Sequence, residues 1–245
     1  MASSTRRRVL IVAYYFPPHG GAGTQRAAKL VEYLPRFGYE PVVITTTTGV
    51  QTASAPTNDP TLLKDVPPVP ICRIPDGRLS AGARLQRALR FDPDEIGWAA
   101  RAAAATRVAI RTYRPDAVVV TVSPYAAALV GTEARRAGIP FVLDLRDPWA
   151  LDGWRVQPTI VHGVADRARM RRSLRRADLV VAPSLRAKAP VSLLAAVACG
   201  VPAVASNLVI PDGLDELVEA HGPTRHELAR ALRRVFEMND GARRG

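Results

Sequence analysis

The residues best suited to bind an anion are the glycines of the stretch His19-Gly20-Gly21-Ala22-Gly23. Because glycine has no Cβ, its backbone N–H group can approach a phosphate closely. A helix is predicted directly after this stretch, and the first N–H groups of a helix are unpaired and lie at the positive end of its dipole. The sequence therefore predicts phosphate binding at Gly20, Gly21 and Gly23, although these glycines could equally serve only to form a tight turn.

Further polar residues follow two predicted strands at the point where each strand ends. Ser123 comes after one apolar run, and Arg146, Asp147 and Trp149 come after the next. Ligands of open parallel sheets bind beyond the carboxyl ends of the strands, so we expect these residues to lie near the glycine loop. Asp147 is a candidate to orient an acceptor or to act as a base, but packing or pairing with Arg146 explains it equally well.

The glycine stretch does not match the motif that binds nicotinamide or flavin dinucleotides. Residues 21–26 supply only two of the three glycines of that motif, and Arg26 stands where close helix packing needs a small residue. The next predicted strand ends in four threonines, residues 45–48, so no carboxylate is available for a ribose, and no Walker lysine follows the glycines. The sequence therefore favours phosphate binding without a dinucleotide cofactor.

The elements that must position these residues alternate between strands and helices. Short apolar runs predict strands at residues 9–16, 41–48, 71–74, 117–122 and 141–145. Between them, Thr24 is the predicted N-cap of the first helix, Asp59 caps a short helical turn, and residues 126–137 form another helix. This alternation predicts an α/β fold with a Rossmann-like parallel sheet and helices on both faces.

The composition is that of an ordinary globular protein. The chain has 245 residues, of which 47% are hydrophobic, enough for one large α/β domain or one domain plus a fragment. The first residues resemble a signal peptide, but Phe16-Pro17-Pro18 stands where the cleavage site would need small residues. Cys72 and Cys199 have neither metal-site nor disulfide spacing, and helix capping explains Asp92 and Asp94 better than a metal clamp. We therefore expect a cytoplasmic protein and assign no metal.

The chain is strongly basic, with a formal net charge of +12. Its densest basic run, residues 167–176, has Met170, Leu174 and Ala177 at helical spacing, with arginines on the remaining faces. These arginines form either a solvated helix face or a surface that binds anionic lipid head groups on the inner face of the membrane. Nucleic-acid binding is less favoured, because no aromatic platform or nucleic-acid motif accompanies the charge.

Longer segments of the sequence resemble a known family. The segments FPPHGGAGTQRAAKLVEYL, DPTLLKDVPPVPICRIP and PDAVVVTVSPYAAALVGTEARRAGIPFVLDLRDPWA are similar to the amino-terminal domain of group 1 retaining glycosyltransferases, which have the GT-B fold. The resemblance covers about residues 7–180 and implies a Rossmann-like acceptor domain, to which we assign residues 1–176. It also implies that Gly20 and Gly21 contact the diphosphate of a nucleotide-sugar donor. The acceptor, a cell-envelope or polysaccharide glycan or a lipid-linked sugar, is then expected at His19, Arg26, Ser123, Arg146 and Trp149.

Residues 177–245 resemble only part of the family's donor-binding domain, so we expect a shortened remnant of that domain. The family's pair of donor-site glutamates aligns with Ala187 and Ala195, so neither carboxylate is present. Whether this chain alone is active is therefore left open. The alternative is a non-catalytic module that docks on a separate donor-domain protein or on an anionic membrane, and oligomerisation is one way to cover leftover apolar surface. The apolar residues of this part should be buried, namely Leu193, Leu194, Val197, Val201 and Val204.

Overall fold

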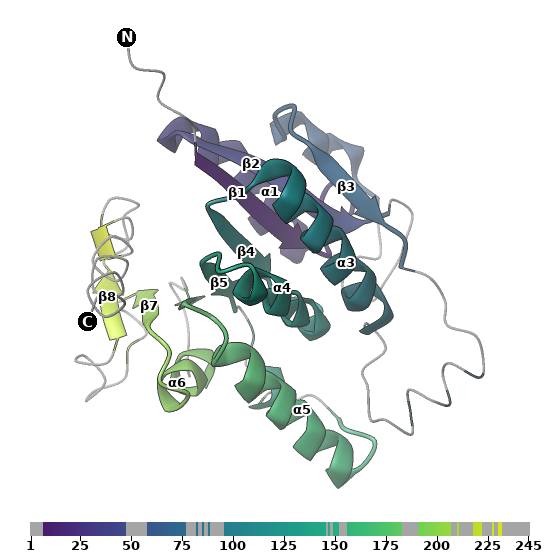
Figure 1. Ribbon diagram of the computed structural model, residues 1–245, viewed down its shortest axis with the longest axis vertical. Helices are drawn as coiled ribbons and strands as arrows, with labels where there is room; N and C mark the ends of the chain where they lie inside the picture. The colour runs from purple at the N-terminus through teal and green to yellow at the C-terminus, as the bar shows by residue number, and fades with distance from the viewer. Residues whose placement is uncertain are drawn as a thin grey trace. The chain divides into compact units, whose positions relative to one another are not determined.

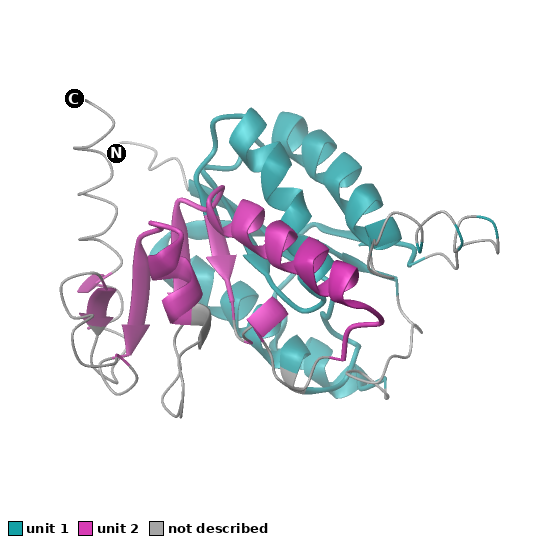
Figure 2. Cartoon of the chain, turned by 90° about the horizontal axis from the view of Figure 1, so that it is seen from below, with its two compact units in different colours: residues 1–141 teal, residues 142–245 magenta. Residues whose placement is uncertain are grey.

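The computed structural model divides the chain into two compact units, residues 1–141 (unit 1) and residues 142–245 (unit 2), which Figure 2 colours separately. It describes residues 7–47, 58–76, 82, 85, 88, 96–145, 147, 149–151, 156–182, 191–206, 210, 218–221, 227, 230 and 231. The two units are defined by how the chain packs. The predicted domain boundary between residues 176 and 177 was drawn from the resemblance to a family, so it stays a prediction.

Unit 1 is built on parallel strands, as the sequence predicts. Its strands are β1 (Arg7–Ala13), β2 (Tyr39–Thr46), β3 (Ile71–Ile74) and β4 (Ala117–Thr121), in the order β3-β2-β1-β4. Each neighbouring pair is parallel. The central strand β1 is buried from Val9 to Ala13, which explains why it reads as an uninterrupted apolar run rather than an alternating one.

The helical elements of unit 1 connect these strands. They are α1 (Ala22–Tyr33), η1 (Leu34–Phe37), η2 (Pro60–Asp65), α3 (Ile96–Tyr113), η3 (Tyr125–Val130) and α4 (Gly131–Arg136). The single helix predicted at residues 126–137 is thus a 3₁₀ segment followed by an α-helix. The prediction that Asp59 caps a helical turn is confirmed, because its carboxylate accepts a hydrogen bond from the Thr61 N–H at 3.0 Å.

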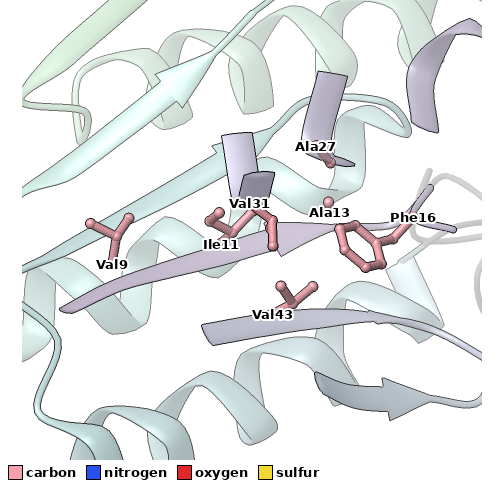
Figure 3. Packing of buried hydrophobic residues seen from close by; sticks show 7 residues of the cluster. All are labelled: Val9, Ile11, Ala13, Phe16, Ala27, Val31 and Val43. Atoms are coloured by element: carbon pink, nitrogen blue, oxygen red, sulfur yellow. The ribbon is translucent and has the colours of Figure 1, made fainter. Parts of the chain in front are cut away.

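Helices cover both faces of the unit 1 strands, which confirms the predicted α/β arrangement. Alternate side chains of β1, among them Val9 and Ile11, pack with Ala27 and Val31 of α1 and with Val43 of β2 (Figure 3). On the other face, α3 packs against β1, β2 and β3 (Figure 1). The α3 residue Trp98 is fully buried there, and its ring lies 4.9 Å from that of Tyr14 in an edge-on arrangement.

Unit 2 also contains parallel strands. They are β5 (Phe141–Asp144, whose first residue closes unit 1), β6 (Leu179–Ala182), β7 (Ala203–Ser206) and β8 (Val218–His221), paired in that order. Its helical elements are η4 (Trp149–Leu151), α5 (Ile160–Leu174) and α6 (Val191–Ala198). The predicted burial is confirmed for Leu193, Val201 and Val204, and Val197 is half-buried. Leu194 is 41% exposed, so its predicted burial is wrong, because it faces outward from α6.

Candidate functional site

The strand order of unit 1 creates a topological switch point beside β1. The connection from β1 leads to β2 on one side, whereas β4 lies on the other side of β1. Ala13 at the end of β1 pairs with Thr121 at the end of β4, so the loops that follow both strands leave the sheet at the same edge. The glycine stretch and Ser123 belong to these two loops. The structure therefore brings together two of the features that the sequence predicts to share a site, at a position where α/β proteins commonly bind ligands.

The first helix begins earlier than predicted. Gly21 is the N-cap of α1, with φ 99° and ψ 164°, a backbone conformation that strongly favours glycine. The prediction that Thr24 caps the helix is wrong. Thr24 lies inside the first turn, fully buried, and its hydroxyl donates a hydrogen bond to the Gly20 carbonyl oxygen at 3.3 Å. Thr24 therefore bonds back to the loop and leaves the helix N-terminus without a side-chain cap.

The start of α1 is well suited to an anion. No side chain caps it, and the first turn contains no acidic residue that would compete for its N–H groups or for the positive end of its dipole.

The three predicted glycines differ in their surroundings. Gly21 is exposed and Gly20 is buried, while a Cβ on Gly23 would lie in ordinary contact, 3.4 Å, with Cδ2 of Tyr15. Gly21 is thus the most exposed of the three glycines, and Gly23 is half-buried.

His19 is buried beside the glycines, with 2% of its surface exposed. Its Nδ1 lies 2.9 Å from the carbonyl oxygen of Phe16, and since a carbonyl can only accept, Nδ1 carries the proton in this contact. The other ring nitrogen, Nε2, is a buried atom without a hydrogen-bond partner among the described residues. Arg26, in α1, is half-buried. Neither placement tests their predicted roles in binding an acceptor.

Segments remote in the sequence hold the loop between β1 and α1. Asn58 forms an antiparallel bridge with His19, and the N–H of Asp59 donates to the carbonyl oxygen of Pro18 at 2.6 Å. From the end of β3, Arg73 donates to the carbonyl oxygen of Pro17 at 2.7 Å. Burial lowers the pKa of the Arg73 guanidinium. These contacts were not predicted from the sequence, because no local pattern links residues 58–73 to the loop.

The remaining predicted site residues belong to unit 2. Arg146 and Ala187 lie outside the described residues, whereas Asp147 is half-buried. Trp149 is 1% exposed and has a positive φ of 54°, which is uncommon for a bulky residue. Its indole N–H donates to Oδ1 of Asp166 at 3.1 Å. The predicted roles of these residues toward an acceptor stay predictions.

One of the two positions that align with the family's donor-site glutamates is described in unit 2. Ala195, which aligns with one of the family's glutamates, is buried in α6. Within the described residues, no three His, Cys, Asp or Glu side chains gather as a metal site. Asp92 and Asp94 lie outside that part of the chain. The described helices include none with the length and apolar character needed to span a membrane.

The parallel α/β fold and the glycine-capped helix at its switch point define the class of this protein as Rossmann-like. Within that class, the model of the family described as "Glycosyl transferase 4-like domain" matches residues 20–192. The chain belongs to this family, which confirms the resemblance inferred from the sequence. No curated protein matches the sequence.

Solved structures are similar to this chain at low identity. A UDP-N-acetylglucosamine 2-epimerase from Methanocaldococcus jannaschii is 13% identical over 97% of this chain and 51% of its own, with a TM-score of 0.48. A putative UDP-N-acetylglucosamine 2-epimerase from Listeria monocytogenes is 14% identical over 80% of this chain and 43% of its own, with a TM-score of 0.49. Sucrose-phosphate synthase from Thermosynechococcus elongatus is 11% identical over 95% of this chain and 90% of its own, with a TM-score of 0.44. The chain spans about half the length of the two epimerases. Similarities this low carry no argument about activity.

Proposed function

We propose that this protein takes part in the transfer of a sugar from a nucleotide-sugar donor to an acceptor, and that it binds the donor diphosphate at the start of α1. Membership of the glycosyl transferase 4-like family supports the reaction class. The observation that carries the proposal is Gly21, an exposed residue at positive φ that leaves the first N–H groups of α1 uncapped at the switch point of the sheet.

The physical contribution of this site is electrostatic. The helix dipole attracts an anion by about 0.3 to 2 kcal/mol, and hydrogen bonds from backbone N–H groups to phosphate oxygens add to that attraction. In sugar transfer with retention, negative charge builds up on the departing diphosphate. Fixed N–H groups that point at this charge lower the barrier without having to reorganise. The same groups therefore serve both donor binding and the chemical step.

The proposal gives the other predicted residues acceptor roles. Ser123 leaves β4 at the same edge as the glycine loop, which supports a contact with the acceptor. His19 and Arg26 would bind the acceptor from unit 1. The predicted roles of Arg146 and Trp149 in binding the acceptor, and of Asp147 in orienting the attacking hydroxyl, are also part of the proposal. The acceptor is a glycan or lipid-linked sugar used in polysaccharide or envelope synthesis at the cytoplasmic side of a membrane.

Nucleotide binding tests the proposal directly. Isothermal titration with a panel of nucleoside diphosphates and nucleotide sugars should show binding to the unchanged chain. Gly21→Val should weaken it at least about tenfold, because the side chain both strains the cap and blocks the N–H groups. Gly38→Val is the matched control, since Gly38 also has a positive φ, 83°, with nothing within 4 Å of its Cβ position. The proposal fails if no member of the panel binds, or if both variants reduce affinity equally.

A further inference from the structure

One face of α5 carries exposed apolar and exposed basic side chains together. The apolar group lies at the N-terminal end of the helix and just before it, where Val156 is 92%, Ile160 85%, Val161 51% and Val164 57% exposed. The basic group follows along the helix and is also exposed. We call the two groups together the α5 face, which consists of Val156, Ile160, Val161, Val164, Arg167, Arg171, Arg172 and Arg175.

Contacts on the opposite side of α5 fix which residues form this face. Met170 and Leu174 are buried, and the carboxylate of Asp166 accepts hydrogen bonds at 3.1 Å from the Trp149 indole and from the Gln157 amide. These residues recur at helical spacing, so they lie along one side of the helix. The buried carboxylate could not leave its two donors without a large desolvation cost. The helix therefore cannot rotate to bury its apolar face within unit 2.

The charges of the α5 face are unpaired in the described part of the chain. The side chains of Arg167, Arg171, Arg172 and Arg175 form no ion pair or hydrogen bond with the residues that the structure describes. By contrast, Glu32 and Glu133 elsewhere in the structure each pair with a basic residue on their own helix. Within the described residues, no ion pair neutralises the basic part of the α5 face. Figure 1 shows α5 as the long green helix of unit 2.

We infer that the α5 face docks on an anionic lipid bilayer. Apolar side chains at one end of a helix can enter the boundary between head groups and acyl chains, while arginines beside them bind lipid phosphates. Each arginine close to an anionic membrane surface strengthens binding by about fivefold. A nucleic acid would match the arginines but would leave Ile160 and Val164 exposed to water. The combination of both groups therefore favours lipid.

This inference deepens the proposed use of a lipid-linked acceptor, and in that respect it rests on the proposed function. It does not depend on donor binding. A protein that docks through α5 would be held at the surface where a lipid-linked acceptor is presented. Vesicle binding can therefore be lost while nucleotide binding is kept, and the reverse, so the two proposals are tested separately.

Vesicle sedimentation of the full chain tests the inference. The chain should sediment with vesicles of phosphatidylcholine and phosphatidylglycerol, and not with phosphatidylcholine alone. Combined Ile160→Ser and Val164→Ser should weaken binding at least about tenfold. Combined Arg171→Gln, Arg172→Gln and Arg175→Gln should weaken it about a hundredfold, the product of three fivefold effects. All these side chains are exposed, so far-UV circular dichroism should show that the variants keep their fold.

A matched control uses the same residue types on a helix of unit 1. Val108 of α3 is 61% exposed and Arg111 is exposed one turn further on. Combined Val108→Ser and Arg111→Gln should leave vesicle binding unchanged, and Gly21→Val should do the same. The inference is overturned if the α5 variants bind vesicles as well as the unchanged chain does, if neutral vesicles bind equally, or if duplex DNA binds through these residues while vesicles do not.

Discussion

At the scale of single residues, Glu133 is the clearest case of a buried charge that its neighbours stabilise. It is 6% exposed, and it accepts hydrogen bonds from Arg107 at 2.9 Å and from Arg136 at 2.8 Å. The hydrogen bond from Arg107 is the main cause that lowers the pKa of Glu133 below its ordinary value. This pair joins α3 to α4, so it is an interaction of the fold and not of the proposed site.

Glu133→Gln should therefore destabilise the protein in a pH-dependent way. Because the pKa of Glu133 is lower in the folded state, its stabilisation is complete above its unfolded pKa of about 4.3 and is lost as the pH falls through the folded value. We expect the free energy of unfolding to fall by about 1 kcal/mol at neutral pH. The loss is no larger because both guanidinium groups are screened by solvent. Urea unfolding at neutral pH and at about pH 3 should show this difference shrinking in acid.

Glu40→Gln is the control for that measurement. Glu40 pairs with Arg8 at 3.3 Å, but both side chains are more than two-fifths exposed, at 43% and 46%. An exposed ion pair of this kind contributes little, so the variant should lose less than about 0.5 kcal/mol. A loss as large as that of Glu133→Gln would contradict the view that burial makes Glu133 important.

At the scale of secondary-structure elements, Gly131 sets how closely α4 approaches the start of β5. A Cβ at this position would overlap the ring of Phe141, which is itself fully buried. Gly131→Ala should therefore destabilise unit 1 by about 1 to 3 kcal/mol through overpacking. Thermal or urea unfolding of the full chain measures the effect.

A second helical glycine provides the comparison. A Cβ on Gly163 of α5 would meet its nearest neighbours at 3.6 Å and 3.7 Å, which are ordinary contacts. Gly163→Ala should then leave stability unchanged or raise it by up to about 1 kcal/mol, because alanine has a higher helix propensity than glycine. Equal losses for Gly131→Ala and Gly163→Ala would mean that the Phe141 contact is not what requires a glycine.

Contacts between elements also explain how the glycine loop keeps its shape. Arg73 at the end of β3, and the Asn58-Asp59 pair before η2, all bond to the backbone of residues 17–19. Ion pairing of Lys29 with Asp65 at 2.9 Å joins η2 to α1 as well. The contacts to the loop itself come from β3 and from the segment that leads into η2. They fix the loop before a ligand binds, so less conformational entropy is lost on binding.

At the scale of the whole molecule, the formal net charge of +12 attracts polyanions of any kind. Binding to a heparin column should accordingly fall steeply with salt. Combined Ile160→Ser and Val164→Ser should not change this retention, because the charge is the same in both forms. Salt elution from heparin, compared with vesicle sedimentation, would then separate general charge attraction from docking through the α5 face. Parallel losses in both assays would contradict a specific role for the apolar residues.

The α/β class, the apolar strands, the glycine loop and the family could all be predicted from the amino-acid sequence. These features are carried by short-range patterns, namely runs of β-branched residues, helical spacing and glycine clusters, which neighbouring residues impose on one another. The family match over residues 20–192 agrees with that local interpretation. Local patterns were less reliable at element ends, because Thr24 has a capping side chain and yet lies within the helix that Gly21 begins.

Three features depend on contacts in the folded chain: which strands are neighbours, what holds the glycine loop and which face of α5 is exposed. Strand order depends on the packing of residues far apart in the chain, such as Ala13 beside Thr121. Arg73 reaches Pro17 across 56 residues of sequence. The orientation of α5 follows from a buried bond between Asp166 and Trp149, which the spacing of arginines alone could not reveal. Long-range contacts of this kind are selected by burial and hydrogen bonding in the folded chain, so no local sequence pattern specifies them.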